Sequence, residues 1–191
     1  PLRKKPKMTR YPPLDNTHWS AEIADMQAGF AGRLNVYRVM AHHPALLRAW
    51  ADLRDHVVVK TALGPELSEV VILRAAHWMG SDYEWAHHVS RARALGFEDH
   101  RIARLAGPID EITGQDQTIA RAVDALMTTR AIPPQMQGPL EAEIGKEGIF
   151  DLIATVGFYS TLGFILNSFP PPLDEAVARE LRETPFLQLK V

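Results

Sequence analysis

The helical spacing of the apolar residues constrains the fold of this chain more than any other feature. Between residues 44 and 57, and again between 66 and 78, apolar side chains recur three or four positions apart, as they do on the buried face of a helix. Similar spacing continues to about residue 183. The β-branched run at 57–59 is too short and too isolated to indicate a sheet. The sequence therefore predicts an all-α protein.

Capping residues and helix breakers divide this pattern into separate helices. Pro44 suits the first turn of a helix, and Gly80 is placed to end or bend the helix before it. Ser81 and Glu84 have the Ser-x-x-Glu spacing of a capping box, so a helix is expected to begin near Ser81. The predicted helices cover residues 17–30, 44–64, 66–78, 81–96, 98–105, 115–130, 134–144, 149–168 and 174–183.

The length of 191 residues is that of one domain. Residues 1–16 are proline-rich and charged without periodicity, so we expect an extended N-terminal arm followed by a single all-α domain over 17–191. Residues 44–106 and 115–169 share a layout of a helix, a turn and a long apolar helix. This similarity suggests two pseudo-repeats.

Charge and hydropathy limit the partners of the chain. Lys and Arg total 21 against 23 Asp and Glu, and the net charge of −2 argues against nucleic-acid binding. The longest apolar stretch, 149–169, is interrupted by polar residues, so we expect a buried helix and no membrane span. No apolar segment follows the basic N-terminus, so the expected location is the cytoplasm.

The chain contains no cysteine. It therefore offers no thiol nucleophile, no redox dithiol and no thiolate metal ligand.

Residues 75–88 are the segment richest in side chains that carry chemistry, with three of the eight histidines and two of the four tryptophans. Glu84 and His88 are four residues apart and share one face of a helix. A carboxylate beside an imidazole fixes its tautomer and raises its pKa, which gives a proton donor near neutral pH. The same spacing also suits a capping-box glutamate in a surface ion pair worth about 0.3–0.5 kcal/mol.

Tyr83 and His87 form a second pair with the same spacing, rotated around the helix. Glu84, His87 and His88 are all possible metal ligands. The sequence has no His-Glu-x-x-His motif, however, and adjacent histidines point about 100° apart on a helix. We therefore predict no metal site.

Three passages resemble the carboxymuconolactone decarboxylase superfamily, which includes the alkylhydroperoxidase D (AhpD) group. They are residues 66–74 (ELSEVVILR), residues 83–92 (YEWAHHVSRA) and residues 150–159 (FDLIATVGFY), with Asn167 after the last. The likeness covers roughly residues 40–170. It implies an AhpD-like helical bundle that assembles as a homo-oligomer, a trimer or a hexamer.

The peroxidase branch of this superfamily has Cys-x-x-Cys followed four residues later by His, with a Glu twelve residues before the first Cys. Aligning on His88 puts Ser81 and Glu84 at the two cysteine positions and Glu69 at the glutamate position. Peroxide reduction needs a thiolate that is oxidised and then resolved. The resemblance therefore implies a cysteine-less, decarboxylase-like branch and disfavours thiol peroxidase activity.

That branch acts on small anionic lactones or ring acids of the 4-carboxymuconolactone type, from aromatic degradation. The resemblance implies a lyase with His88 as general acid, oriented by Glu69 or by Glu84. No cofactor is needed if the substrate acts as its own electron sink. The residues expected to bind substrate are Ser81, Tyr83, Trp85 and His87, with Arg74 or Arg91 as the cation for the substrate carboxylate.

The sequence leaves two other interpretations of the function open. The same pocket suits an isomerase or a hydrolase, and the bundle also suits a catalytically silent oligomeric binding protein. Glu69, Glu84 and His88 within hydrogen-bond reach in a pocket would favour an enzyme. Exposure of these residues, or their cover by Trp78 and Trp85, would favour the binding protein.

Overall fold

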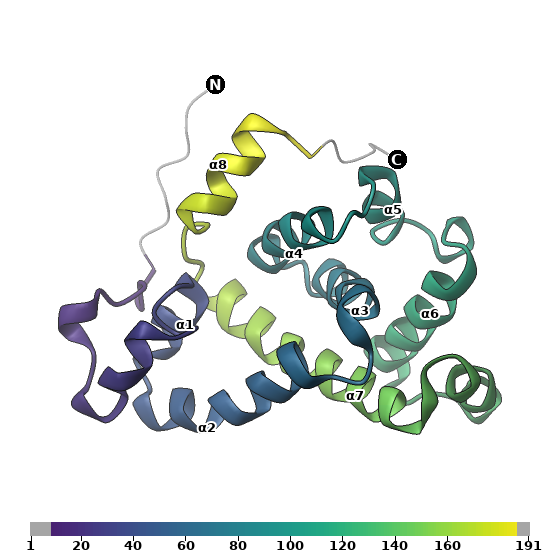
Figure 1. Ribbon diagram of the computed structural model, residues 1–191, viewed down its shortest axis with the longest axis horizontal. Coiled ribbons are helices and arrows are strands. Elements are labelled where there is room, and N and C mark those ends of the chain that lie inside the picture. Colours follow the sequence, from purple (N-terminus) through teal and green to yellow (C-terminus); the bar gives the residue numbers. More distant parts are fainter. Residues whose placement is uncertain (1–8, 187–191) are drawn as a thin grey trace.

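The computed structural model describes residues 9–186, which form helices and turns without any strand (Figure 1). The all-α prediction is confirmed. The α-helices are α1 (Asn35–Met40), α2 (Pro44–Asp55), α3 (Gly64–Met79), α4 (Asp82–Ala94), α5 (Asp99–Arg104), α6 (Gly114–Thr129), α7 (Pro134–Ser168) and α8 (Glu175–Glu183). Short 3-10 helices cover Asn16–His18, Ala21–Ala28 and Ile109–Glu111, and a π-helical turn covers His56–Lys60.

Helix α3 is the centre of the fold and contacts α4, α6 and α7 (Figure 1). Every residue from Ser68 to Ala76 is buried, so α3 meets neighbours on all sides. Two apolar clusters flank it. Leu73 belongs to the cluster with α5 and α6, while Ile72 belongs to the cluster with α1, α2 and the C-terminal half of α7. Polar side chains on α3 are therefore held in fixed positions between two packed cores.

Several predicted boundaries agree with the structure within a few residues. Gly80 has the left-handed conformation (φ 57°) and ends α3, as expected for a C-terminal glycine. The prediction of a capping box is wrong. Ser81 immediately precedes α4, but its hydroxyl accepts no hydrogen bond from a backbone amide of that helix. Glu84 faces the interior instead, because α4 packs that side against α3.

Other elements differ from the prediction. Helix α1 was not predicted, and residues 21–28 form a 3-10 helix. The run at 57–59 lies in the π-helical turn. By contrast, the two helices predicted over 134–144 and 149–168 are both present, joined in α7 across a kink at Gly145, whose φ of 70° and ψ of 172° are non-helical. Such angles favour glycine, which explains why the chain can bend there.

The N-terminal arm lies partly outside the described residues, since 1–8 are not among them. Its described end packs on its own chain. The amide of Leu14 donates to the carbonyl of Arg38, and the Tyr11 ring stacks edge-on against His42 and Phe169.

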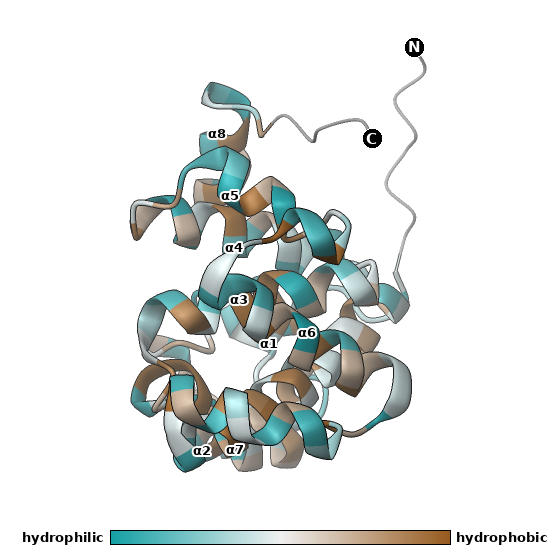
Figure 2. Ribbon diagram, turned by 90° about the vertical axis from the view of Figure 1, so that its right-hand side faces the viewer, coloured by the Kyte–Doolittle hydropathy of each residue, from teal (hydrophilic) through white to brown (hydrophobic). Residues whose placement is uncertain are grey.

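Helix α7 is long and apolar enough, by length and composition, to cross a membrane, but half of its most apolar window is buried in the protein. Figure 2 shows the hydrophobic residues that it carries. Phe150, Ile153 and Phe164 remain exposed on it, at 66%, 42% and 64%. The homo-oligomer implied by the resemblance, in which a second copy would cover such residues, stays a prediction.

After α7, three prolines lead to α8, which lies along α4 (Figure 1). The hydroxyl of Ser90 on α4 donates to Glu180 on α8, and Arg93 lies 3.6 Å from the same carboxylate. Helix α8 has no buried residue, so these contacts and the segment before it hold it in place.

Candidate active site

His88 lies in the interior between α3 and α4, held by two glutamates. Its Nδ1 is 2.5 Å from Oε2 of Glu69 on α3, and its Nε2 is 3.5 Å from Oε2 of Glu84 on its own helix. All three residues are buried. The short contact with Glu69 fixes the ring orientation, which leaves Nε2 as the nitrogen that can exchange a proton with a ligand.

The charges around His88 favour its protonated form. Burial alone would lower the pKa of His88, but Glu69 and then Glu84 outweigh it and raise that pKa above its usual value. Burial would likewise raise the pKa of Glu69, but His88 and Arg91 hold it below its usual value. Arg91 Nε lies 3.1 Å from Oε1 of Glu69. Both pKa shifts therefore favour an imidazolium beside a carboxylate.

A cavity of about 210 Å³ opens beside His88. The edge of His88 meets the Tyr159 ring, with centroids 5.0 Å apart. The polar side chains on the cavity wall come from α1, α2, α4 and α7: Tyr37, Arg54, Tyr83, Glu84, His87, His88, Ser90, Arg91 and Tyr159.

Two polar atoms of the residues that form this wall have no partner among the described residues. They are Oε1 of Glu84 and Nε of Arg54, and both are buried. A buried donor or acceptor without a partner costs about 1–3 kcal/mol, so such atoms call for an explanation. Both residues line the cavity, but the two atoms themselves have almost no accessible surface, so a polar ligand would supply the missing bonds only if these side chains moved.

Two phenols complete the donor set. Burial, with the nearby Glu84, raises the pKa of Tyr37 to about 12 and raises that of Tyr159 well above its usual value. Both hydroxyls therefore keep their protons at neutral pH and can donate to an oxygen in the cavity.

Tyr83 and His87 also line the cavity, but their polar atoms are engaged by Asp174. The Tyr83 hydroxyl donates to Asp174, and His87 Nε2 lies 2.8 Å from the same carboxylate oxygen. The amide of Asn35 donates to Asp174 over 3.0 Å. Asp174 thereby joins α1 and α4 to the segment that precedes α8. Burial would raise the pKa of Asp174, but the hydrogen bonds from His87 and Tyr83 hold it below its usual value.

Replacing Asp174 with alanine is expected to destabilise the fold by about 1.5–3 kcal/mol, because hydrogen bonds to a charged group are lost. Urea denaturation measures this change. Asp52→Ala is the matched control, since Asp52 is exposed on α2. Equal stabilities of the two variants would show that Asp174 does not anchor the C-terminal segment.

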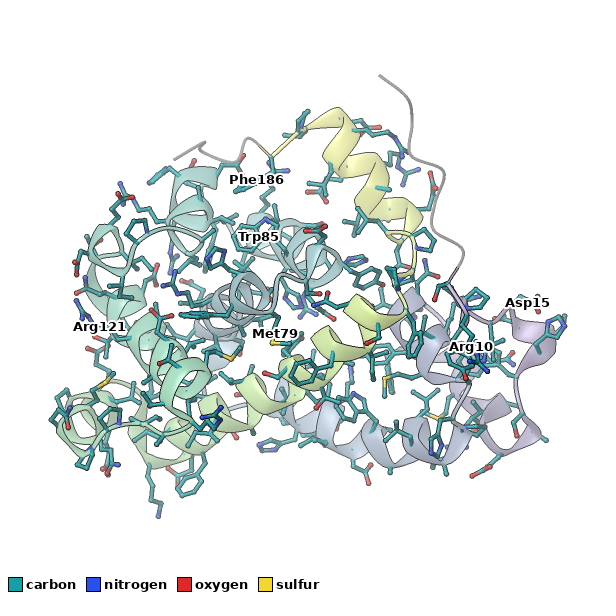
Figure 3. The ribbon with its side chains drawn as sticks, turned by 180° about the vertical axis from the view of Figure 1, so that it is seen from behind. Arg10, Asp15, Met79, Trp85, Arg121 and Phe186 are labelled. Carbon is teal, nitrogen blue, oxygen red and sulfur yellow. The ribbon has the colours of Figure 1, made fainter. Side chains whose placement is uncertain are left out.

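Three of the predicted substrate-binding residues lie outside this cavity and are corrected here. Arg74 is buried in an ion pair with Asp124, with Nε 2.6 Å from Oδ1, because that side of α3 packs on α6. Ser81 lines a different cavity, beside the prolines that follow α7. Trp85 points toward Phe186 near the C-terminus (Figure 3).

Sequence reasoning missed Tyr37, Arg54, Tyr159 and Asp174. Each lies at least 34 residues from His88 in sequence, so no local spacing links it to the histidine. Among residues 9–186, no group of three or more His, Asp or Glu side chains has an arrangement that could hold a metal ion.

The sequence around this site is similar to that of a known protein family. The sequence model of the carboxymuconolactone decarboxylase family matches residues 44–127, the part of the chain that carries Glu69, Glu84 and His88. Residues 44–127 therefore carry the sequence pattern of the carboxymuconolactone decarboxylase family, and the chain has an AhpD-like fold. No curated protein matches the sequence.

Several solved structures have the same fold as this chain. The AhpD core of an uncharacterized peroxidase-related protein from Ralstonia eutropha has a TM-score of 0.76 at 15% identity, over 90% of this chain and 95% of that one. The debrominase Bmp8, as a cysteine-to-alanine variant bound to 2,3,4-tribromopyrrole, has a TM-score of 0.73 at 14% identity, over 92% and 97%. A protein of unknown function from Agrobacterium tumefaciens has a TM-score of 0.63 at 21% identity, over 74% and 98%.

This chain has an AhpD-like fold but contains no cysteine. Of the two residues aligned with the peroxidase cysteines, Glu84 lies on the wall of the His88 cavity and Ser81 does not. The chain therefore brings no thiol to the site, while Glu69 and His88 remain in contact.

Proposed function

We propose that this chain is a cofactor-free, decarboxylase-like lyase that acts on a small anionic lactone or ring acid, with His88 as general acid. The observation that carries the proposal is the buried Glu69–His88–Glu84 cluster beside a cavity that Arg54 and Arg91 also line. A proton donor near two guanidinium groups suits an anionic substrate.

The cavity residues divide into binding and proton-transfer groups. Arg54 lies over the Phe30 ring and lines the cavity, so its guanidinium is placed to bind a carboxylate that the product retains. The protonated phenols of Tyr37 and Tyr159 are suited to donate to a carbonyl oxygen on which charge develops. Glu84 Oε1 would accept from the substrate or hold the imidazolium in place.

In the proposed step, the bond between the ring and the departing carboxylate breaks and carbon dioxide leaves. The electron pair of that bond spreads through the conjugated lactone to its carbonyl oxygen, as a dienolate. His88 then donates its Nε2 proton to a ring carbon, which restores a neutral lactone. Solvent returns the proton to His88, so the cycle consumes no other reactant.

One structural neighbour supports a ring-sized ligand. One neighbour, the debrominase Bmp8, has been solved with a tribrominated five-membered ring. The inner cavity of about 210 Å³ suits a molecule of that class. A debromination that depends on a thiol has no counterpart in this chain, which contains no cysteine.

The direct test is incubation of the purified protein with 4-carboxymuconolactone while the release of carbon dioxide is followed. Release above the uncatalysed rate supports the lyase proposal. Failure to release carbon dioxide from this lactone and from related ring acids, by a protein that is folded, would contradict it and favour the isomerase, hydrolase or silent binding protein.

Replacing Arg54 with glutamine is expected to weaken the binding of benzoate, a minimal ring acid, by about 10- to 100-fold. The reason is the loss of a charge-assisted hydrogen bond. Isothermal titration calorimetry measures the change. Arg48→Gln, which alters an exposed arginine of the same helix, serves as control. Unchanged affinity in Arg54→Gln would remove Arg54 from the binding group.

A further inference from the structure

A second and larger cavity, of about 430 Å³, lies on the other side of Arg91. It is bounded by the π-helical turn, the start of α3 and the end of α4. Thr61, Ser68, Glu69 and Arg91 supply its polar side chains. The rest of its wall is apolar and consists of Val57, Val58, Val59, Pro65, Ile72, Ala94 and Leu95, together with the backbone of Gly64.

The two cavities are neighbours that share Val58 and Arg91. The Arg91 side chain is 48% exposed and is tied to Glu69 by one ion pair. Val58 lies in the π-helical turn, an irregular element that occurs often at functional sites. Val58 and the half-exposed Arg91 side chain therefore border both cavities.

We propose that the outer cavity is a second compartment of the substrate site, which takes an apolar tail on an anionic ring whose carboxylate is held by Arg54 and Arg91. The inference deepens the proposed function and rests on it for the place of the charged head group. It names the substrate class as an alkyl- or aryl-substituted ring acid, larger than an unsubstituted lactone.

Size and chemistry support two compartments. Sites for organic ligands usually enclose about 300–1,000 Å³, and the inner cavity of about 210 Å³ is below that range, whereas the outer one of about 430 Å³ is within it. Val59 and Leu95 on the outer wall are 62% and 41% exposed. An apolar tail would cover them and be removed from water itself.

Binding of benzoate, 4-ethylbenzoate and 4-butylbenzoate, measured by calorimetry, tests this proposal without any turnover. Each methylene that enters the outer cavity is expected to tighten binding by about fourfold. An affinity that does not rise along the series would overturn the proposal, as would a protein that binds none of the three acids.

Two variants show where the tail binds. Ala94→Phe fills the outer cavity from the end of α4 and is expected to abolish the gain from the tail while benzoate still binds. Ala142→Phe is the matched control, because Ala142 is exposed on the first part of α7, away from both cavities. A gain that persists in Ala94→Phe would place the tail elsewhere and overturn the proposal.

The result is separable from that of the lyase test. Binding that strengthens with tail length, in a protein that releases no carbon dioxide, would keep the two-compartment site and reject the decarboxylase chemistry. Release of carbon dioxide by a protein whose affinity does not depend on tail length would keep the decarboxylase chemistry and reject the two-compartment site.

Discussion

Replacing His88 with glutamine is expected to lower the rate of carbon dioxide release by about 10²- to 10⁴-fold, the usual contribution of a general acid. Glutamine fills much of the same space and can still donate a hydrogen bond to Glu69, but it cannot deliver a proton. Because Arg54 and Arg91 are untouched, KM is expected to change little. Steady-state kinetics on the lactone measure both constants.

The pH profile adds a second readout for His88. Its pKa is raised above the usual value, so the protonated form extends further toward alkaline pH than in a free imidazole. The rate of the wild-type protein is expected to fall as pH rises through this raised pKa. In His88→Gln the residual rate should lack this dependence.

His100→Gln is the matched control, since His100 is exposed on α5. It should keep both the rate and the pH profile of the wild type. A His88→Gln variant that is folded and as fast as the wild type would contradict the proposed role of His88.

Replacing Glu69 with glutamine is expected to destabilise the fold by about 3–5 kcal/mol, because one partner of a buried ion pair is removed. Glu69 accepts from His88 through one oxygen and pairs with Arg91 through the other. Glutamine can replace one of these acceptors but carries no charge. Urea denaturation at several pH values measures the loss.

The pH dependence of the stability follows from the shifted pKa values of Glu69 and His88. The pKa of Glu69 lies below its usual 4.5, so its contribution to stability is present above pH 4.5 and is lost as pH falls through the lowered value. The pKa of His88 lies above its usual 6.5, so its contribution is complete below pH 6.5 and is lost as pH rises through the raised value. The variant should therefore differ most from the wild type between pH 4.5 and 6.5.

Glu66→Gln, one turn earlier on α3, provides the comparison. Glu66 is 62% exposed and should contribute within about 0.5 kcal/mol, as is usual for surface positions. A Glu69→Gln variant as stable as Glu66→Gln across this pH range would show that the buried pair does not stabilise the fold.

The part of the site that the sequence predicts best is the part on a single helix. Glu84 and His88 are one turn apart on α4, and the structure brings their side chains to 3.5 Å. Glu69, expected from the family resemblance, does meet the histidine and is the glutamate that contacts Nδ1. The spacing by itself favoured a surface ion pair, and only the packing of α4 on α3 excludes it.

Arg54 and Arg74 show where sequence reasoning stops. Both are arginines on predicted helices, and Arg74 was expected to bind substrate. The structure pairs Arg74 with Asp124 on α6 and places Arg54 on the cavity wall. Which of the two arginines reaches the cavity depends on which helix packs against each side of α2 and α3. The residues next to Arg54 and Arg74 in the sequence do not determine that packing.

The sequence by itself determined the helical class, most helix positions and the Glu84–His88 pair, because helical periodicity and capping act over a few residues. The tertiary structure alone decided the cavity, the positions of Arg54 and Arg91 on its wall and the role of Asp174. These depend on which surfaces of distant helices are buried together, and the free energy of that burial comes from packing across the whole chain.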